Sequence, residues 1–410
     1  MTGYINREIA GRVREALASM PAVVLTGMRQ SGKSTFLQND AALKRRRYYS
    51  LDRFADLEGI KRNVEEYLRP PDPVTIDEAQ RHPGLMEAIK EQVDREGQVP
   101  GRFLLSGSAN FSLLRGVTET LAGRAIYLEM LPMSRREILR RTRSEPFIKS
   151  FFDDPDILRT CPAGKRVTEE DVLRGGMPRI ALRSVRDAAV WFQGYEQTYL
   201  ERDVRQLSQV ADLIAFRRGI RLAALRTGKI LKISEVARDA QIPVNTPTRY
   251  LGVMEASCLL WRLPPFSGNP SSRLIKSPKL HWSDSGLAAH LSAARDISPS
   301  ADSMMRGPLF ETWVAQNLQS ILSAKWPEAK LHYWSVQGRH EVDFVIGVNH
   351  ECLAIEVKTS SRWNENDLTG LKAFLGSTPK CRAAILAYSG NSIVPLGNRL
   401  YALPLDLVVS

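Results

Sequence analysis

A glycine-rich segment near the N-terminus restricts the fold of this chain more than any other feature. Residues 22–37 read AVVLTGMRQSGKSTFL, in which Gly27, four further residues and then Gly32, Lys33 and Ser34 follow a short apolar run. Such a run is typical of a buried parallel strand. Glycines at this spacing let backbone N–H groups surround a phosphate. The segment therefore predicts a strand, a phosphate-binding loop and a helix whose N-terminus faces the anion.

The loop also assigns roles to single residues. We expect the ammonium of Lys33 to reach the β- and γ-phosphates of ATP, and the hydroxyl of Ser34 to bind Mg²⁺. ATP and Mg²⁺ are therefore the expected cofactors. The residues expected to contact the nucleotide form one continuous stretch: Gly27, Met28, Arg29, Gln30, Ser31, Gly32, Lys33, Ser34 and Thr35.

A second apolar run ends in two carboxylates. Residues 72–80 read DPVTIDEAQ, and Asp77 follows the short β-type run Val74–Ile76. Ligands of parallel sheets bind at the carboxyl ends of the strands. We expect Asp77 to hold Mg²⁺, directly or through water, and Glu78 to orient and polarise the attacking water. The alternative is structural, because acidic residues also suit the start of a helix.

Polar residues end a third predicted strand, over residues 102–110 (RFLLSGSAN). A side chain at that position can contact the γ-phosphate or the attacking water. Ser108 and Asn110 are the candidates for this role. Arg124, at the start of a further predicted strand, is a candidate for stabilising charge on a neighbouring subunit, although most arginines at strand starts do nothing of the kind.

Length, composition and charge limit the number of domains, the cellular location and the partners that can be expected. The 410 residues predict two or three domains, and no apolar run approaches the roughly 18 residues of a membrane span. The N-terminus lacks the apolar core of a signal peptide, and the four cysteines form no CxxC pair. A cytoplasmic protein without a membrane partner is therefore expected. The net charge of +12 suits nucleic acid, with DNA favoured over RNA, while a homo-oligomer and a protein partner stay open.

The middle of the chain has a helical pattern. Helices are expected over 215–228, 232–241 and 244–257, with a tight turn before the last one, and the following CLLWRLPPF can supply a β wing. This order predicts a winged helix. If it binds DNA, the last helix enters the major groove with Asn245, Thr248, Arg249 and Tyr250 foremost. The alternative is a winged helix that only packs against protein.

A segment rich in Pro, Ser and Gly follows, over residues 264–291. It places Arg273, Lys276 and Lys279 at three-residue spacing. Such a strip can contact phosphates, or it can pair with acids on the first domain.

The last part of the chain predicts a helix over 307–322 that carries Glu311, followed by a β-hairpin. With a four-residue loop at 348–351, Gly347 pairs with Cys352. Asp343 then lies opposite Glu356, and Glu341 opposite Lys358. Side chains two residues apart share a strand face, so these four ionisable groups form a cluster.

The cluster has a known chemical use. Carboxylates of Glu311, Asp343 and Glu356 can bind Mg²⁺ or Mn²⁺, and Lys358 can position or activate water for phosphodiester attack. Glu341 would be an extra acid. The structural alternative is a lattice of cross-strand salt bridges.

The motifs LTGMRQSGKST, TIDEAQRHP, LLSGSANF and LAGRAIYLEMLPMS together resemble the AAA+ ATPase family that carries a C-terminal domain of unknown function 4143. Asp…Glu-x-Lys on a hairpin, after a helix with Glu, resembles the restriction-endonuclease-like fold. These resemblances imply an α/β chain with an AAA+ type parallel sheet that binds ATP and a separate, nuclease-like α/β C-terminal domain. The helical pattern of the middle of the chain adds a winged-helix segment between them. The expected divisions are 1–140 (ATPase core), 141–208 (linker and helices), 209–292 (winged helix) and 293–410 (nuclease-like domain).

The function expected from these parts is Mg²⁺-dependent ATP binding and hydrolysis, coupled to a nucleic-acid-binding winged helix and a nuclease-like domain. The alternative is an ATP-dependent switch that binds nucleic acid or docks protein, with an inactive nuclease-like scaffold.

Overall fold

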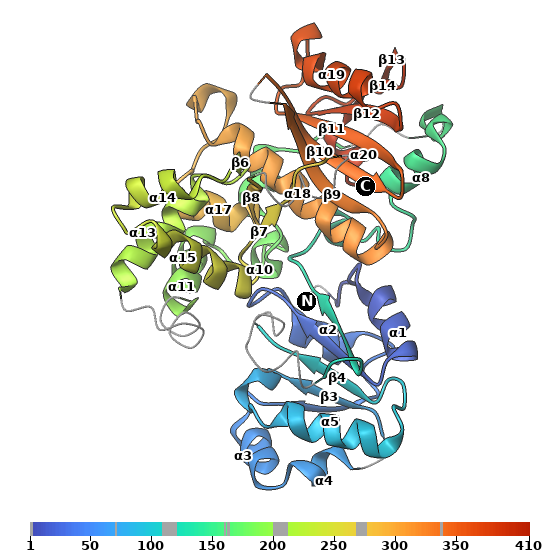
Figure 1. Ribbon diagram of the computed structural model, residues 1–410, viewed down its shortest axis with the longest axis vertical. Coiled ribbons are helices and arrows are strands. Elements are labelled where there is room, and N and C mark those ends of the chain that lie inside the picture. The colour runs from blue at the N-terminus through green and yellow to red at the C-terminus, as the bar shows by residue number, and fades with distance from the viewer. Residues whose placement is uncertain are drawn as a thin grey trace. The chain divides into compact units, whose positions relative to one another are not determined.

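The chain forms two units in a computed structural model (Figure 1). The first unit comprises Met1–Pro132 with Gly252–Leu259, and the second comprises Met133–Leu251 with Leu260–Ser410. The finer division into four domains stays a prediction. The structure describes residues 3–69, 72–108, 121–159, 161, 165–199, 212–267, 277–336 and 339–410.

The first unit is built on a five-stranded sheet in the order β2-β3-β4-β1-β5, with all neighbouring strands parallel. Every residue of β1, β3 and β4 is buried, as expected for a parallel sheet covered on both faces. The strands are β1 (Ala22–Thr26), β2 (Arg47–Ser50), β3 (Val74–Asp77), β4 (Phe103–Ser106) and β5 (Ala125–Glu129). The helices are α1 (Ala10–Ser19), α2 (Lys33–Asn39), α3 (Phe54–Arg62), α4 (Val64–Leu68) and α5 (Leu85–Glu96). This sheet confirms the predicted P-loop type of α/β fold.

The strand order positions the site. Strand β4 lies between β1 and β3, although it follows both in the chain. Because the strands are parallel, their carboxyl ends meet at one edge of the sheet. The loop after β1, the acidic end of β3 and the polar end of β4 are therefore neighbours.

The first half of the second unit is mainly helical. Its antiparallel sheet has the order β6-β8-β7. The three helices predicted in this region lie close to their expected positions, and β6 comes after the first of them. The strands are β6 (Lys229–Ile230), β7 (Leu260–Leu263) and β8 (Lys279–Trp282). The helices include α7 (Arg135–Ile138), α8 (Phe147–Asp153), α9 (Glu169–Arg174), α10 (Pro178–Ala181), α11 (Ala188–Thr198), α13 (Leu213–Ala224), α14 (Ile233–Ala240), α15 (Asn245–Ala256, shared with the first unit) and α17 (Ser285–Leu291).

The C-terminal part combines a long helix with a six-stranded mixed sheet, drawn in orange and red in Figure 1. Strands β9, β10 and β11 are antiparallel, and α19 connects β11 to its parallel neighbour β12. The sheet order is β13-β14-β12-β11-β10-β9. The elements are α18 (Arg306–Lys325), β9 (Lys330–Val336), β10 (His340–Val348), β11 (Glu351–Lys358), α19 (Thr369–Ser377), β12 (Cys381–Tyr388), β13 (Val394–Gly397), β14 (Leu400–Pro404) and α20 (Leu405–Val408).

The hairpin between β10 and β11 has the predicted register but a shorter turn. Gly347 pairs with Cys352, as expected, and Val348 also pairs with Glu351. The predicted four-residue loop is therefore wrong, and the turn consists of Asn349 and His350. Asn349 has a φ of 50°, which asparagine tolerates better than most residues and which tight hairpin turns require.

A bulge interrupts the pairing of β10 with β9 between Val342 and Val345. Bulges redirect side chains, and this one includes Asp343. In the part of the chain that the structure describes, no helix is both long enough and apolar enough to cross a membrane.

Candidate functional site

The phosphate loop joins β1 to α2 and has the backbone of an anion cradle. Gly27 has a φ of 145° and Gly32 a φ of 96°, conformations that side chains with a Cβ rarely adopt. A Cβ on Gly27 would also overlap the carbonyl oxygen of Met130. The loop therefore depends on glycine at this position, as the sequence predicted, and its shape fits a phosphate group.

Lys33 lies in the first turn of α2 and folds back over the loop. Its Nζ donates to the carbonyl oxygens of Gly27 (2.8 Å) and Met28 (3.0 Å). The side chain is only 5% exposed. Burial lowers the pKa of Lys33, against the opposing pull of the Glu78 carboxylate. A bound phosphate would supply the negative charge that this buried ammonium lacks in the loop.

Asp77 ends β3 and is 1% exposed. Both of its carboxylate oxygens are held by hydroxyl groups. Ser106, at the end of β4, donates to Oδ1, and Tyr48 of β2 donates to Oδ2 at 2.7 Å. Sequence reasoning found Asp77 but assigned no role to Ser106 or Tyr48. The signal for Ser106 was its place at the end of a strand, beside the predicted sensor position.

Glu78 has a φ of 57°, which turns its side chain out of the strand direction. Its Oε2 accepts from Gln80 Nε2 at 2.5 Å and from Ser108 Oγ at 3.4 Å. Gln80 also donates to Ser108 Oγ at 3.2 Å. Burial raises the pKa of Glu78, while Lys33 opposes the shift. Ser108 therefore lies beside the expected base, and Gln80 is a contact that the sequence did not reveal.

Two other residues of this unit, Asn110 and Arg124, were also predicted to have roles in ATP hydrolysis. Asn110 lies outside the residues that the structure describes. Arg124 donates through Nε (2.6 Å) and Nη2 (2.9 Å) to the carboxylate of Asp94. Its expected role toward a neighbouring subunit stays a prediction.

The groups at this edge suit Mg²⁺-ATP. Mg²⁺ prefers oxygen ligands and is commonly held by few protein groups together with phosphates. Ser34, half-buried in the first turn of α2, and Asp77 offer such oxygens. These are the two residues of the first unit that would hold the ion.

An acidic centre lies in the second unit, and a lysine occupies it. Nζ of Lys279, on β8, lies 2.9 Å from Oε1 of Glu311 on α18. It also lies 2.5 Å from Oε1 of Glu341 and 3.3 Å from Oδ1 of Asp343, both on β10. The expectation that Lys279 contacts phosphates or acids of the first domain is therefore wrong. Arg273 and Lys276 lie outside the described residues.

The electrostatics of this centre favour a charged ammonium. Burial alone would lower the pKa of Lys279, but the carboxylates of Glu311, Asp343 and Glu341 outweigh burial and raise it well above its usual value. Burial raises the pKa of Glu311 to about 8, although Lys279 opposes this shift.

Glu356 and Lys358 lie beside this centre on β11. Lys358 Nζ is 3.4 Å from Oε1 of Glu356 and 3.7 Å from Oδ1 of Asp367. Burial and then the charge of Asp343 raise the pKa of Glu356 well above its usual value. Its Oε2 is buried and has no hydrogen-bond partner among the residues described here. Asp343 Oδ2 accepts from the backbone N–H of Val357 at 2.9 Å.

As arranged, these residues do not fit a bound divalent ion. Within the described ranges, no three His, Cys, Asp or Glu side chains converge as metal ligands do. The N···O distances around Lys279 are those of charged hydrogen bonds and ion pairs. Glu311, Asp343 and Glu356 were predicted to hold a metal ion. Glu311 and Asp343 instead contact the ammonium of Lys279.

The helix predicted over 244–257 is present as α15, and four residues separate it from α14. Asn245, Thr248 and Arg249 are exposed. Tyr250 is 3% exposed and its ring centroid lies 4.9 Å from that of Phe216. The predicted contact of Tyr250 with DNA is therefore wrong, because its ring packs in the interior.

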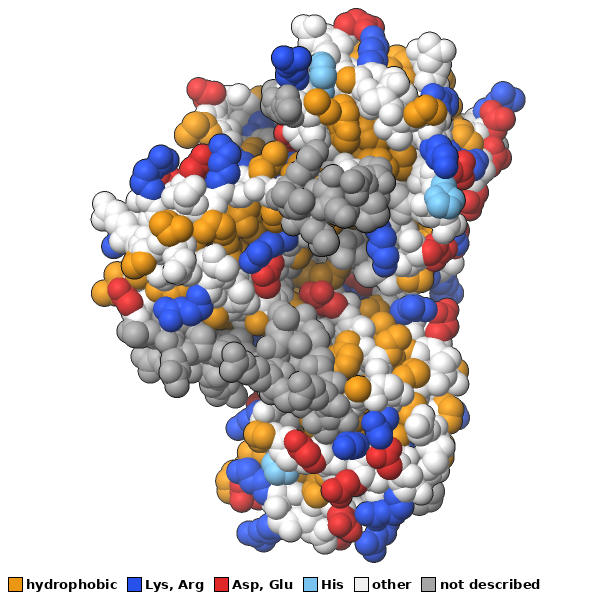
Figure 2. Space-filling view, in the orientation of Figure 1, with side chains coloured by type: hydrophobic (Ala, Val, Ile, Leu, Met, Phe, Trp, Pro, Cys, Tyr) orange, Lys and Arg blue, Asp and Glu red, His pale blue; other side chains and the backbone are white. Residues whose placement is uncertain are grey.

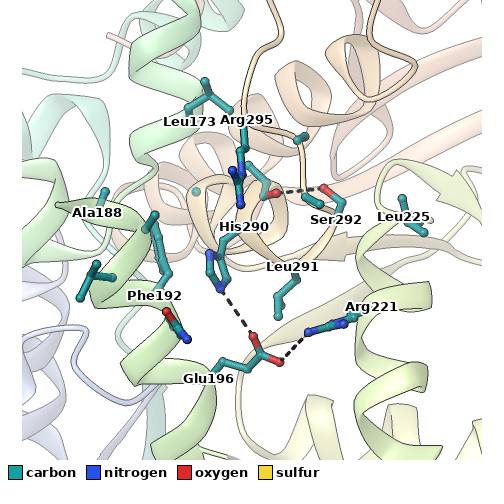
Figure 3. A pocket seen from close by; sticks show the side chains of 17 residues that line it. Leu173, Ala188, Phe192, Glu196, Arg221, Leu225, His290, Leu291, Ser292 and Arg295 are labelled. Carbon is teal, nitrogen blue, oxygen red and sulfur yellow. Dashed lines mark hydrogen bonds and ion pairs between the residues drawn. The ribbon is translucent and has the colours of Figure 1, made fainter.

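The second unit also contains a pocket of about 930 Å³ between α11, α13 and α17. Figure 3 shows the side chains of His290 and Arg221 facing the carboxylate of Glu196. The distances are 3.5 Å from His290 Nε2 and 3.8 Å from Arg221 Nη2. The hydrogen bond from His290 lowers the pKa of Glu196 against the effect of burial. The other walls are largely apolar, with Leu173, Phe192, Leu225 and Leu291 among them.

Comparisons with known protein families agree with the domains predicted for the N-terminal and C-terminal parts of the chain. Residues 19–139 match an AAA domain, residues 166–298 the domain of unknown function 8612, and residues 306–408 the domain of unknown function 4143. An uncharacterized protein of Mycobacterium tuberculosis is 28% identical over 406 residues, which cover 99% of this chain and 85% of that protein.

Two solved structures are similar to this chain at lower sequence identity. The Walker-type ATPase of Pyrococcus abyssi covers 70% of this chain and 96% of its own, with 15% identity and a TM-score of 0.41. The RuvB Holliday junction branch migration motor of Thermotoga maritima covers 63% and 90%, with 17% identity and a TM-score of 0.30. The family matches confirm the resemblance: the chain carries an AAA domain and, at its C-terminal end, a domain of unknown function 4143.

Proposed function

We propose that the first unit binds ATP and hydrolyses it with Mg²⁺. One arrangement carries this proposal: the phosphate loop follows β1, Asp77 ends β3, and Ser106 of the intervening strand β4 donates a hydrogen bond to Asp77. A phosphate cradle and a carboxylate at the same sheet edge are the two parts that phosphoryl transfer to water requires.

Each side chain has a role in this reaction. Lys33 exchanges the loop carbonyls for the β- and γ-phosphates, while Ser34 and Asp77 hold the ion. The bound Mg²⁺ offsets the charge that develops on the phosphates. Glu78 orients the water that attacks the γ-phosphorus and accepts its proton as the bond to ADP breaks. The raised pKa of Glu78 suits a general base.

Ser108 and Gln80 contact Glu78 and can limit its availability as a base. Both hydrogen-bond to Glu78. If the γ-phosphate attracts the Ser108 hydroxyl, Glu78 loses one of these contacts and becomes available to the water.

Two substitutions test the proposal. Lys33→Ala is expected to abolish ATP binding, measured with a fluorescent ATP analogue. Glu78→Gln is expected to bind ATP but to stop phosphate release. Glu91→Gln, an exposed position on α5, is the matched control and should behave as wild type. Equal hydrolysis by wild type and Glu78→Gln would overturn the role of Glu78.

A second function, nucleic-acid binding by α15, is supported by the exposed side chains of Asn245, Thr248 and Arg249 near its N-terminal end. A helix that follows another after a short turn can enter the major groove in this manner. On the face seen in Figure 2, however, Lys and Arg are interspersed with Asp and Glu and form no continuous basic stripe. The binding proposed here therefore rests on α15 and not on the overall charge.

Salt dependence tests this second function. Arg249→Ala should weaken DNA binding and reduce the slope of log K against log salt by about 1 if Arg249 contacts a phosphate. Arg12→Ala, a change at a half-buried position on α1 near Glu15, is the control. Absence of any salt-dependent DNA or RNA binding by the wild type would favour the protein-docking alternative.

We propose that the C-terminal domain does not cleave nucleic acid, because Lys279 lies where Glu311 and Asp343 would hold the ion. The domain is proposed to act as a scaffold. Cleavage of DNA or RNA with Mg²⁺ or Mn²⁺ that is lost in Lys358→Ala would contradict this role.

A further inference from the structure

We propose that the pocket between α11, α13 and α17 binds a small organic anion with an apolar body. The inference goes beyond the proposed functions, because every residue that lines the pocket belongs to the second unit and none of them to the ATP site or to α15. All of them also lie within residues 166–298, the part of the chain that matches the domain of unknown function 8612.

The size and the walls of the pocket suit a small molecule. Its volume of about 930 Å³ lies within the range of roughly 300–1,000 Å³ that is typical of small-molecule sites. Four helices contribute apolar side chains to the lining: Leu173 of α9, Phe192 of α11, Leu225 of α13 and Leu291 of α17. The segment after α17 adds residues 292–295. A ligand in this pocket would therefore contact apolar groups from several elements at once.

Two of the apolar side chains in the lining are open to solvent. Val190 is 64% exposed and Leu225 is 40% exposed. Phe192 and Leu291, by contrast, are buried. An apolar ligand body that covers Val190 and Leu225 would remove their side chains from water, which is favourable.

The one carboxylate of the lining, that of Glu196, already has basic partners on both oxygens. Oε2 lies 3.5 Å from His290 Nε2, and Oε1 lies 3.8 Å from Arg221 Nη2. The hydrogen bond from His290 lowers the pKa of Glu196 against the effect of burial, and the charge of Arg221 adds to this shift. The ring of Phe192 stacks on that of His290, with centroids 5.6 Å apart. Glu196 is therefore engaged within the protein and is not free to attract a cationic ligand.

Arg295 supplies positive charge without a counter-ion. It lines the pocket and is exposed, and Figure 3 shows its guanidinium pointing toward His290. Its side chain has no hydrogen bond or ion pair within the residues that the structure describes. A guanidinium presents its N–H donors in a planar fork that matches the oxygens of a carboxylate or a phosphate. An anionic group beside Arg295 and an apolar body against Val190 and Leu225 would satisfy both features of the pocket.

A pair of fluorescent probes tests the inference. Anilinonaphthalene sulfonate combines an aromatic body with one negative charge, and phenylnaphthylamine has nearly the same body without the charge. The wild type should bind one sulfonate probe per chain, counted by equilibrium dialysis. Arg295→Gln should weaken binding of the sulfonate about tenfold, the cost of one lost hydrogen bond to a charged group, and should leave the neutral probe unchanged. Arg238→Gln, at an exposed arginine on α14 outside the pocket, is the control and should change neither affinity.

A variant that fills the pocket locates the site. Ala189 is exposed and lines the pocket, so Ala189→Trp should abolish binding of both probes. If Ala189→Trp does not fold, Leu225→Glu adds a negative charge to the lining at a partly exposed position. It should weaken binding of the sulfonate more than that of the neutral probe, and equal effects on the two probes would count against the inference.

Three results would overturn the inference. One is the absence of saturable sulfonate binding by the wild type. Another is a folded Ala189→Trp protein, verified by circular dichroism, that binds both probes as the wild type does. The third is an Arg295→Gln protein in which the sulfonate and the neutral probe are affected equally, because the pocket would then not recognise charge through Arg295.

Discussion

Nζ of Lys279 lies 2.9 Å from Oε1 of Glu311 and links β8 to α18 inside the second unit. A neighbouring contact joins the same parts of the chain, because Thr227 Oγ1 and Thr312 Oγ1 are 2.7 Å apart. Thr227 Oγ1 also accepts from the backbone N–H of Trp282, at the end of β8. The three-stranded sheet and the C-terminal domain therefore share buried polar contacts and should unfold together.

Lys279→Met should lower the free energy of unfolding of this unit by about 3–5 kcal/mol at pH 8, the range for loss of one partner of a buried ion pair. The loss should shrink as the pH falls toward 5.5. The pKa of Glu311 is already raised to about 8 with Lys279 present, so without the lysine Glu311 takes up a proton more readily. A protonated carboxyl needs no cation.

Urea denaturation at pH 5.5 and pH 8 measures this difference. The control is Lys372→Met, at an exposed ion pair that should contribute no more than about 1 kcal/mol. A loss that stays the same at both pH values would show that the buried carboxylates do not depend on Lys279 for charge balance.

Ser106→Ala should weaken the use of Mg²⁺ more than the binding of ATP. The Ser106 hydroxyl donates to Oδ1 of Asp77, which is 1% exposed. Without that hydroxyl, the carboxylate can turn away from the ion. We expect roughly a tenfold loss of kcat, of the order seen when a group that orients a metal ligand is removed, and a higher Mg²⁺ concentration for half-maximal activity.

Phosphate release at varied Mg²⁺ concentration measures this effect, with Ser19→Ala on the exposed end of α1 as control. Unchanged Mg²⁺ dependence in Ser106→Ala would mean that the hydroxyl serves only the packing of β4.

The phosphate loop was predictable from sequence because its groups are contiguous and the glycines carry their conformational requirement with them. Asp77 was predictable because it ends an apolar run. The contacts of Asp77 were not, because Tyr48 and Ser106 each lie 29 positions away in the chain. Their approach depends on the strand order β2-β3-β4, and no local pattern specifies that order.

In the acidic centre, too, the contacts between residues far apart in the chain were not predictable from sequence. The alternation of β10 and β11 was enough to place Asp343 near Glu356, since a hairpin pairs residues in a fixed register. The partner of these acids was not predictable, because Lys279 lies 32 positions from Glu311 and 64 from Asp343. The bulge that contains Asp343 also has no signal in the alternation of the strand.

Gly27→Ala should abolish ATP binding, and Gly97→Ala should not. Both glycines have positive φ, 145° and 77°. A Cβ on Gly27 would overlap the Met130 carbonyl, whereas a Cβ on Gly97 meets nothing within 4 Å. Gly97→Ala should therefore cost only about 1 kcal/mol of stability for its left-handed backbone. Nucleotide titrations of the two variants separate the effect of the cradle from that of positive φ, and equal ATP affinity would contradict the close approach at Gly27.

Asp284→Asn should change the pH dependence of unfolding. The buried carboxylate of Asp284 accepts from the backbone N–H groups of Gly176 (2.6 Å) and Leu287 (2.7 Å). Burial raises the pKa of Asp284 to about 6, although these N–H groups oppose the shift. The unfolded chain has a pKa of about 3.9 at this residue. Between these values the folded state binds more protons, so the contribution of Asp284 to stability falls as the pH rises.

Asparagine does not titrate, so the advantage of wild type over Asp284→Asn should be largest near pH 4. It should decrease by roughly 2 kcal/mol between pH 4 and pH 7 and then stay constant. Asp296→Asn is the control, because the N–H of Ser298 lowers the pKa of this exposed aspartate and its pH effect has the opposite sign. Guanidinium unfolding of all three proteins at several pH values measures the difference. A difference between wild type and Asp284→Asn that is constant from pH 4 to 7 would mean that Asp284 is ionised in the folded state throughout that range.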